Sequence, residues 1–292
     1  MGKITLLLTN SLILITSFAA TAELNMGGKS IFSGTVIEVL EPGPATQIQS
    51  IITNITDASA SNPYLIQLGP GVYDLGNTQI VMKEWVSLQG AGQEATKITS
   101  ADITNDATSA VVIGADNADL TDLTIVNTSG SSYSIAILNE GSSPRIERVT
   151  ATASGAGTNI GIRNRLGSSP VMINVTTSAS GGVISYGVSN IASAPIMTHV
   201  TASASDGSSD NTGVRNFNVG SPVLADVTAT ASGGSGTNIG IDSTASSTPV
   251  MTNITAIASG GSVSVGVVNS GSYLIHIKDS TMQGDTYGLH LN

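Results

Sequence analysis

The chain has 292 residues and a formal net charge of −10 at pH 7, and only 3% of its residues are aromatic and 10% charged. At 40% hydrophobic it is too apolar to be disordered, yet it lacks the bulky side chains of an ordinary globular core. Its acidity argues against nucleic acid as a partner, and the absence of cysteine excludes disulfides and thiolate metal sites. We expect no metal and no other cofactor.

The first 22 residues have the pattern of a secretory signal peptide. Lys3 precedes an apolar stretch over 4–19, and Ala20-Thr21-Ala22 forms an A-x-A cleavage site. A buried N-terminal helix is the alternative. No later segment is apolar enough to span a bilayer. The pattern predicts an exported protein, either extracellular or periplasmic.

Residues 23–60 are predicted to be a linker followed by a helix over 46–56. Ile48, Ile51, Ile52 and Ile55 recur at the spacing of one helix face. We expect this helix to cap the solenoid predicted below for 61–292, since an open end of stacked strands exposes core and unpaired backbone. The alternative is a surface helix unrelated to the stack.

A motif returns about every 26 residues through the second half of the chain, with prolines at Pro144, Pro170, Pro195, Pro222 and Pro249. A period of this length predicts a solenoid of stacked coils. Between the prolines lies a second motif, such as NIGIRN at 159–164. Alternation there predicts Ile160, Ile162, Tyr186 and Val188 inside, with the asparagines or serines and the glycines outside. Tyr287 is also expected inside, which leaves the surface almost without aromatic residues.

Two corners are predicted in each coil. The strand of the second motif is expected to stop at Asn139, Asn164, Asn190 and Asn216, because asparagine tolerates a left-handed bend and its amides can bond from coil to coil. The second corner lies before the valine or equivalent aliphatic residue of the proline motif, at Asp122, Arg148, Asn174, His199, Asp226, Asn253 and Asp279. Six of these seven residues are types enriched in left-handed backbone. Three strands and two corners describe a three-sided parallel coil.

The pattern S-S-P-x-I-x-N-V-T followed by G-I-x-N resembles the repeat of the right-handed parallel β-helix of pectate lyases and related carbohydrate-active proteins. The segments LGPGVYDL (68–75) and IVMKEWVSLQGAG (80–92) are similar to the start of pectinesterase-type helices. The resemblance implies an all-β, three-sided right-handed solenoid. It implies no single activity, because this fold carries lyases, hydrolases, esterases, tailspikes and inert spacers.

No catalytic residue is predicted. The sequence has no complete pectinesterase, polygalacturonase or pectate lyase motif. The nearest approach to a carboxylate cluster is Asp116, Asp119 and Asp122. Stacking places Asp122 about 5 Å from Arg148, at the spacing of neighbouring strands, which we interpret as a surface ion pair.

Two groups of residues are candidates for ligand binding. Arg163, Arg215 and Asp242 lie on an outward stripe, where they either contact an acidic sugar or form a solvated face. Thr150, Thr152, Thr228 and Thr230 belong to a regular outward array of hydroxyl groups. Such an array could contact a glycan, and it resembles the flat faces of some ice-binding proteins. The alternative is that threonine and serine are present only because they favour β-strands on an exposed sheet.

The sequence therefore predicts an exported β-helix protein with a structural or surface-interaction role, directed at a polysaccharide or a cell-envelope glycan. The alternative is a pectin lyase-like polysaccharide-degrading enzyme, a lyase or esterase, with an atypical active site. The final coil, 275–292, ends on a strand with no predicted cap, which indicates end-on self-association or a tolerated polar terminus.

Overall fold

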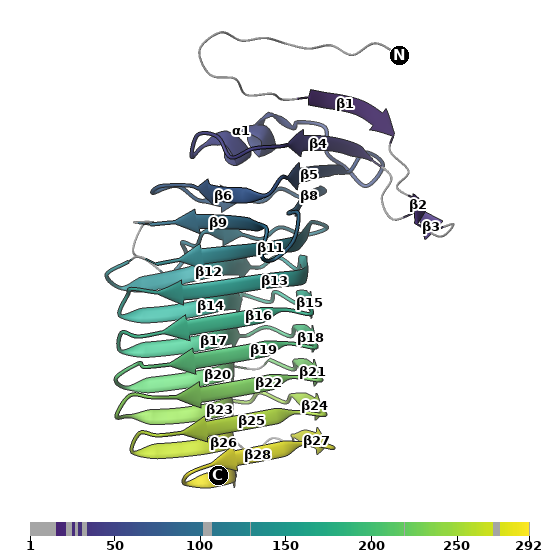
Figure 1. Cartoon of the computed structure of the whole chain (residues 1–292). Helices are drawn as coiled ribbons and strands as arrows, with labels where there is room; N and C mark the ends of the chain where they lie inside the picture. The colour runs from purple at the N-terminus through teal and green to yellow at the C-terminus, as the bar shows by residue number, and fades with distance from the viewer. Residues whose placement is uncertain are drawn as a thin grey trace.

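The computed structural model describes residues 16–21, 25–26, 29–30, 34–101, 107–128, 130–218, 220–270 and 275–291, with side chains from residue 34 onward. The chain forms a right-handed parallel β-helix whose coils stack in sequence order from the N-terminal to the C-terminal end (Figure 1). This confirms the predicted fold class. Most of the predicted signal peptide, 1–22, lies outside the described residues.

One side of the coil is a nine-stranded parallel sheet, here called the long-strand sheet. Its short first and last strands are β7 (Ile80–Val81), β10 (Val112–Ile113) and β29 (Tyr287–Leu291). Between them lie six strands of eight residues each: β12 (Tyr133–Glu140), β14 (Thr158–Arg165), β17 (Ile184–Ile191), β20 (Asp210–Phe217), β23 (Thr237–Thr244) and β26 (Val263–Ser270).

An 18-stranded sheet forms the rest of the coil. Its three-residue strands are β15 (Val171–Ile173), β18 (Ile196–Thr198), β21 (Val223–Ala225), β24 (Val250–Thr252) and β27 (His276–Lys278). Each precedes a longer strand: β16 (Thr176–Ser180), β19 (Thr201–Ser205), β22 (Thr228–Ser232), β25 (Thr255–Ser259) and β28 (Thr281–Gly284). With the long strand, these make the predicted three strands per coil.

The earlier coils are less regular. Their strands are β4 (Thr35–Val39), β5 (Tyr64–Leu68), β6 (Gly71–Asp74), β8 (Val86–Gln89), β9 (Thr96–Ser100), β11 (Asp119–Asn127) and β13 (Arg145–Ser154). β4 lies within the segment predicted as linker and helix, and it pairs in parallel with β5. Outside the stack, β1 (Thr16–Thr21) pairs antiparallel with β4, and β2 (Asn25–Met26) pairs with β3 (Lys29–Ser30).

Helix α1 (Gln47–Asn54) confirms the helix predicted over 46–56 and lies at the N-terminal end of the stack (Figure 1). Ile48 and Ile52 are buried in the main core, as the helical spacing predicted. The side chain of Gln49 accepts a hydrogen bond from the backbone N–H of Val81 at 2.7 Å, which ties the helix to β7. Among the residues described, no helix is long and apolar enough to cross a bilayer.

The interior is a narrow, continuous column of aliphatic side chains stacked in register. Ile137, Ile162, Val188, Val214 and Ile241 follow one another on successive long strands, and each is 0% exposed. Burial of such rows is the main favourable contribution to folding, because each coil removes apolar surface of its neighbours from water. Small residues suffice here, which explains the low aromatic content.

The corner before the valine is left-handed at all seven positions for which it was predicted. The φ angles are 57° at Asp122, 51° at Arg148, 53° at Asn174, 52° at His199, 55° at Asp226, 53° at Asn253 and 51° at Asp279. Asparagine and aspartate are enriched here because they occupy this region at lower cost than most residues.

The other corner was predicted wrongly in part. Asn139, Asn164, Asn190 and Asn216 remain inside their strands and are buried, and the left-handed residues come two positions later, at Leu166, Ala192 and Asn218, where φ is 57°, 49° and 63°. The predicted amide ladder is present. Each Nδ2 donates to the Oδ1 of the next coil at 2.8, 2.8 and 2.9 Å, and Asn216 donates to Ser243 at 3.2 Å. The amides are therefore selected for stacking rather than for bending.

Before the glycine of each long strand, the side chains predicted to face the core face the outer surface, and those predicted to face outward are buried. Asn159 and Asn211 are 0% exposed and bond the preceding turn, whereas Ile160 packs in a separate cluster with Ile135, Leu138 and the partly buried Tyr186. The cause is the glycine that follows. A Cβ on Gly187 would lie 2.6 Å from the carbonyl oxygen of Gly213 and 2.9 Å from the amide nitrogen of Ser203 on the opposite sheet. The glycine thus faces inward, and the alternation changes phase there.

Candidate functional site

The outer face of the long-strand sheet carries a row of polar and charged side chains, here called the arginine row. Its members are paired in register on successive strands: Arg163, Ser189, Arg215 and Asp242. The apolar Leu138 precedes them in the same register, and Val268 follows them. Adjacent strands are about 4.8 Å apart, so the row is a straight line along the axis of the solenoid. The structure thereby brings together the three charged residues that the sequence singled out.

Aromatic rings support both arginines of this row. The guanidinium carbon of Arg163 lies 5.7 Å from the centre of the Tyr133 ring. The guanidinium carbon of Arg215 lies 5.1 Å from the centre of Tyr186 and 4.5 Å from that of Phe217. At these distances the ring faces attract the cations. The outer face therefore presents three half-buried aromatic side chains beside its two cations.

This arrangement corrects the expectation that Tyr186 and Tyr287 face the interior. Tyr186 contacts Arg215 on the outer face, and Tyr287 is 51% exposed. The expectation failed because it assumed that inward and outward side chains keep alternating without interruption past the glycine. The signal that could have located the aromatic face is the glycine itself, since an invariant small residue within every long strand marks a close approach of two backbones.

Burial changes the electrostatics of the row. Arg163 donates from Nη1 to the backbone oxygen of Ala107 at 3.2 Å, and burial lowers the pKa of its guanidinium, with the nearby Arg165 adding to this effect. Arg165 itself forms an ion pair with Glu140 at 3.0 Å. Burial raises the pKa of Asp242 to about 6, although Arg215 opposes that shift.

Three buried polar atoms of the row have no hydrogen-bond partner among the described residues: Nε of Arg163, Oγ of Ser189 and Oδ1 of Asp242. Ser189 is only 1% exposed. Unpartnered buried polar atoms are rare and costly, because each has lost its water without gaining another bond. Their concentration along one line separates this row from the rest of the surface.

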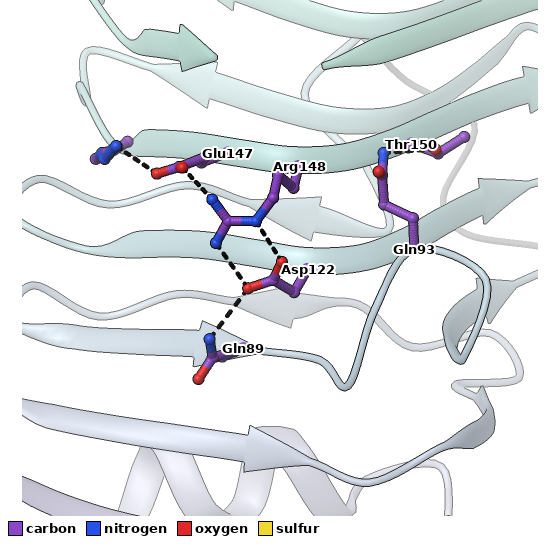
Figure 2. Close-up of polar contacts among 7 residues, drawn as sticks. Gln89, Gln93, Asp122, Glu147, Arg148 and Thr150 are labelled. Carbon is purple, nitrogen blue, oxygen red and sulfur yellow. Dashed lines mark hydrogen bonds and ion pairs between the residues drawn. The ribbon is translucent and has the colours of Figure 1, made fainter. Parts of the chain in front are cut away.

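The predicted hydroxyl array is present on a different side of the coil. Thr150 and Thr228 belong to one register row of the 18-stranded sheet, and Thr152 and Thr230 belong to the next. All four are partly exposed. Thr150 also accepts a hydrogen bond from Nε2 of Gln93 at 3.1 Å (Figure 2). The two groups of predicted ligand-binding residues therefore do not converge on one site.

The predicted pair of Asp122 and Arg148 is confirmed at the left-handed corner (Figure 2). Arg148 donates from Nε and Nη2 to the two oxygens of Asp122 at 2.5 and 2.9 Å, and it also contacts Glu147. Gln89 donates to the same carboxylate at 3.0 Å. Arg148 lowers the pKa of Asp122, with burial acting against it. Since each charge is already paired, this cluster is an ion-pair network at the surface.

Carboxylates do not gather elsewhere in the described part of the chain. No group of three or more histidine, aspartate or glutamate side chains is placed there to hold a metal ion. Asp116 accepts a hydrogen bond from the backbone N–H of Ser143 at 2.7 Å, a structural role in the turn. His199 lies 3.5 Å from Asp226 in the corner ladder.

No protein-family model matches the sequence, and no curated protein matches it significantly. Solved structures share its fold. The A-module of the mannuronan C-5 epimerase AlgE4 from Azotobacter vinelandii aligns with a TM-score of 0.50 and 17% identity, covering 86% of this chain and 79% of that one. The pectate lyase Pel9A aligns with a TM-score of 0.50 and 15% identity, covering 76% of this chain and 63% of that one. At these identities the likeness shows the parallel β-helix fold alone.

Proposed function

We propose that this is an exported β-helix protein that binds an acidic polysaccharide or cell-envelope glycan through the arginine row. The observation that carries the proposal is the placement of Arg163 and Arg215 on one outward line, each against an aromatic ring, with Ser189 between them. Guanidinium groups bind carboxylates and sulfates through paired, charge-assisted hydrogen bonds. The rings of Tyr133, Tyr186 and Phe217 add flat apolar surface for the faces of sugar rings.

The charge of the whole chain makes this cationic line distinctive. The net charge is −10, so general electrostatic attraction of polyanions is not expected. Binding must instead depend on the local pairs of cation and ring. The proteins that share the fold are named as a mannuronan epimerase and a pectate lyase, both directed at polysaccharides, which supports this class of ligand.

The threonine array is a separate prediction. Thr150, Thr152, Thr228 and Thr230 lie on the 18-stranded sheet, so a glycan held at the arginine row does not reach them. A glycan contact on that face would be independent of Arg163 and Arg215. Binding that survives loss of both arginines and is lost in Thr228→Val and Thr230→Val would assign the site to the hydroxyl face.

A second candidate is a polysaccharide-modifying enzyme with an atypical site. Asp242 has a raised pKa near 6, and its row neighbour Arg215 carries the opposite charge. A carboxylate of this kind can accept a proton from the carbon next to a uronate carboxylate that an arginine neutralises. The observation favours this chemistry only as the alternative, because the next possible acid or base in this register row, His290, lies two strands beyond Asp242, with Val268 between them.

The experiment is a binding screen of the purified protein against polygalacturonate, polymannuronate and a neutral glucan, combined with an assay for unsaturated and reducing ends. We expect binding to the polyuronates and no binding to the neutral glucan. Arg215→Gln should weaken that binding about tenfold or more, as loss of a charged hydrogen bond predicts. Arg145→Gln, on β13 of the other sheet, is the matched control and should bind normally. Release of new chain ends would establish the enzymatic alternative.

The export prediction has its own test. If residues 1–22 are a signal peptide, protein recovered from the medium or periplasm begins at Glu23. Recovery of the chain with its first 22 residues intact would contradict that prediction.

End-on self-association through the last coil also remains a proposal. Strand β29 is the last strand of its sheet, and Tyr287, Leu289 and Leu291 are 51%, 39% and 61% exposed. Such an edge can pair with the same edge of a second copy. A mass measurement in solution that gives only monomer at high concentration would contradict it.

A further inference from the structure

We propose that the protein forms a reversible dimer through the outer face of its short strands, with the two solenoids antiparallel. The face is formed by β15, β18, β21 and β24, which stack along one side of the coil (Figure 1). It is separate from the arginine row, so dimer formation goes beyond glycan binding and is independent of it. The partner is a second copy of this chain.

An unbroken row of branched aliphatic side chains, here called the aliphatic row, runs down this face. Its members are paired in register on successive strands: Val171, Ile196, Val223 and Val250. Ile196, Val223 and Val250 are 46%, 41% and 43% exposed, although the residue after each of them is buried in the core. The polar left-handed corner lies beside the row. A continuous exposed apolar patch with polar surroundings marks an interaction surface, whereas scattered apolar residues do not.

Strand formation does not require these side chains to be apolar. The neighbouring wall of the coil carries threonine at the equivalent coils, in a row here called the hydroxyl row: Thr176, Thr201, Thr228 and Thr255. Threonine has the branched shape of valine and also favours strands, but it keeps a hydroxyl group for water. Valine and isoleucine in place of threonine on the short strands therefore indicate a surface that is covered.

Charged residues lie at both ends of the face. Beside the aliphatic row runs a second row through Ile173, which begins at Glu147 and ends at Lys278. The side chain of Lys278 is 77% exposed. The aliphatic row itself begins after Arg145 and ends before His276. The second row therefore carries opposite charges at its two ends.

A two-fold axis parallel to the strands, midway between β18 and β21, makes the face complementary to itself. It places Ile196 opposite the partner's Val223, and Val171 opposite the partner's Val250. The aliphatic row then packs on the same row of the second copy. Facing sheets pack about 10 Å apart with interdigitating side chains, and straight rows of this kind suit that contact.

The same axis brings opposite charges together at the ends of the face. Glu147 lies opposite the partner's Lys278, and Arg145 lies opposite the partner's His276. Glu147 already contacts Arg145 and Arg148, but a carboxylate has about four acceptor sites and can take a further donor. The planar guanidinium of Arg145 can stack on the imidazole ring. This charge complementarity is what favours a second copy as the partner.

A parallel dimer, with its axis along the solenoid, fits less well. It would place the aliphatic row against the second row, so that Ile196 would meet the partner's Thr198 and Val223 would meet the partner's Ala225. It would also place Lys278 opposite the partner's His276, with no carboxylate between them. The antiparallel arrangement buries more apolar surface and pairs the charges.

The size of the face predicts a weak dimer. Six strands, from β13 to β27, span about 24 Å, and a three-residue strand spans about 10 Å. This is well below the roughly 800 Å² that each partner buries in a stable interface of standard size. We therefore expect a dissociation constant above about 1 µM.

The first test is sedimentation of the purified protein from about 10 µM to about 1 mM. Val223→Asp buries a charge near the centre of the interface and should weaken association about a hundredfold or more, and Val223→Thr should weaken it about tenfold. Thr230→Asp, on the neighbouring wall, and Leu289→Asp, on β29, are the controls and should associate like the parent. Thermal unfolding checks that each variant is folded.

The second test locates the contact and uses the absence of cysteine from the chain. Ile173→Cys and Thr252→Cys lie three coils apart in one copy but face each other across the proposed axis. A short bismaleimide should join the two variants in a mixture and should not join either variant to itself. Thr176→Cys and Thr255→Cys, three coils apart in the hydroxyl row, form the matched mixture and should stay unlinked.

Three results would overturn this arrangement. A protein that remains monomeric up to about 1 mM does not use the face for self-association. Association that is lost in Leu289→Asp and kept in Val223→Asp would place the contact at the last coil. Cross-linking of Ile173→Cys to itself, without cross-linking to Thr252→Cys, would show a parallel dimer. None of these results bears on the arginine row, whose test is glycan binding.

Discussion

Asp242 is paired in register with Arg215, one coil further along the arginine row. Its carboxyl is partly buried, one of its oxygens has no hydrogen-bond partner among the described residues, and burial raises its pKa from 3.8 to about 6. Asp210 raises this pKa further, and Arg215 lowers it. The folded protein therefore holds this proton more tightly than the unfolded chain does.

The first prediction is that Asp242 makes stability fall as the pH rises from about 4 to about 6. The folded state binds the proton more tightly than the unfolded chain, whose pKa is near 3.8, so ionisation above that value disfavours folding until the folded pKa of about 6 is passed. Asp242→Asn should remove this dependence and raise stability at pH 7 by about 2–3 kcal/mol. Urea unfolding at pH 4, 5, 6 and 7 measures it.

The control for this variant is Asp279→Asn, which makes the same chemical change at an exposed corner. Because Asp242 is still present in it, this variant should keep the fall in stability between about pH 4 and pH 6. A parent and an Asp242→Asn variant with parallel profiles would show that the carboxyl is as well solvated in the folded state as in the unfolded chain.

The second prediction concerns Asn190 in the buried amide ladder. Its Nδ2 donates to Asn216 at 2.9 Å, and its Oδ1 accepts from Asn164 at 2.8 Å. Asn190→Ala leaves both neighbours with an unpartnered polar atom and should cost about 2–5 kcal/mol. Asn139→Ala, at the end of the ladder, removes one bond and should cost about half as much. Equal losses in urea unfolding would contradict a cost that follows the number of ladder bonds removed.

The corners and the ladder show what sequence alone can determine. Asparagine at a position such as 174 indicates a left-handed backbone, because asparagine and aspartate adopt that conformation more readily than most residues. The corner before the valine was therefore predictable. Asn190 has the same chemistry but uses it for stacking. One residue type served two physical roles, and only the positions of neighbouring coils separate them.

The arginine row was predictable only in part. Alternation after the glycine placed Arg163, Arg215 and Asp242 outside, and the register confirms that they share one line. Before the glycine the same rule failed for Tyr186. The change in side-chain alternation depends on contact between Gly187 and β19, a different strand of the coil. The alternation of residues within the long strand therefore does not predict it.

The third prediction tests the left-handed corner at His199, where φ is 52°. Its side chain is 61% exposed and lies 3.5 Å from Asp226, so packing and charge contribute little there. His199→Asn should change stability by less than about 0.5 kcal/mol, and His199→Val should cost about 1–2 kcal/mol, because a β-branched residue is strained in this region. Thr198→Val, one residue earlier in β18, should be tolerated. Thermal unfolding in which both valine variants lose the same stability would contradict a backbone cause.

The last prediction concerns Gly187, the residue at which the long strand changes phase. A Cβ added there would lie 2.6 Å from the carbonyl oxygen of Gly213 and 2.9 Å from the amide nitrogen of Ser203. Gly187→Ala should therefore cost about 1–3 kcal/mol in urea unfolding, as overpacking of a close backbone contact does.

Because Gly187 also fixes Tyr186 on the outer face, its alanine variant should weaken polyuronate binding at a temperature where it remains folded. The comparison is Ala136→Gly on β12, where the chain already accommodates a buried Cβ at the corresponding position. That variant should lose about 1 kcal/mol, through the lost methyl group and added backbone freedom, and keep its binding. Full stability in Gly187→Ala would mean that the phase change is set by the adjoining turn. Lost stability with unchanged binding would separate the packing of Gly187 from the position of Tyr186.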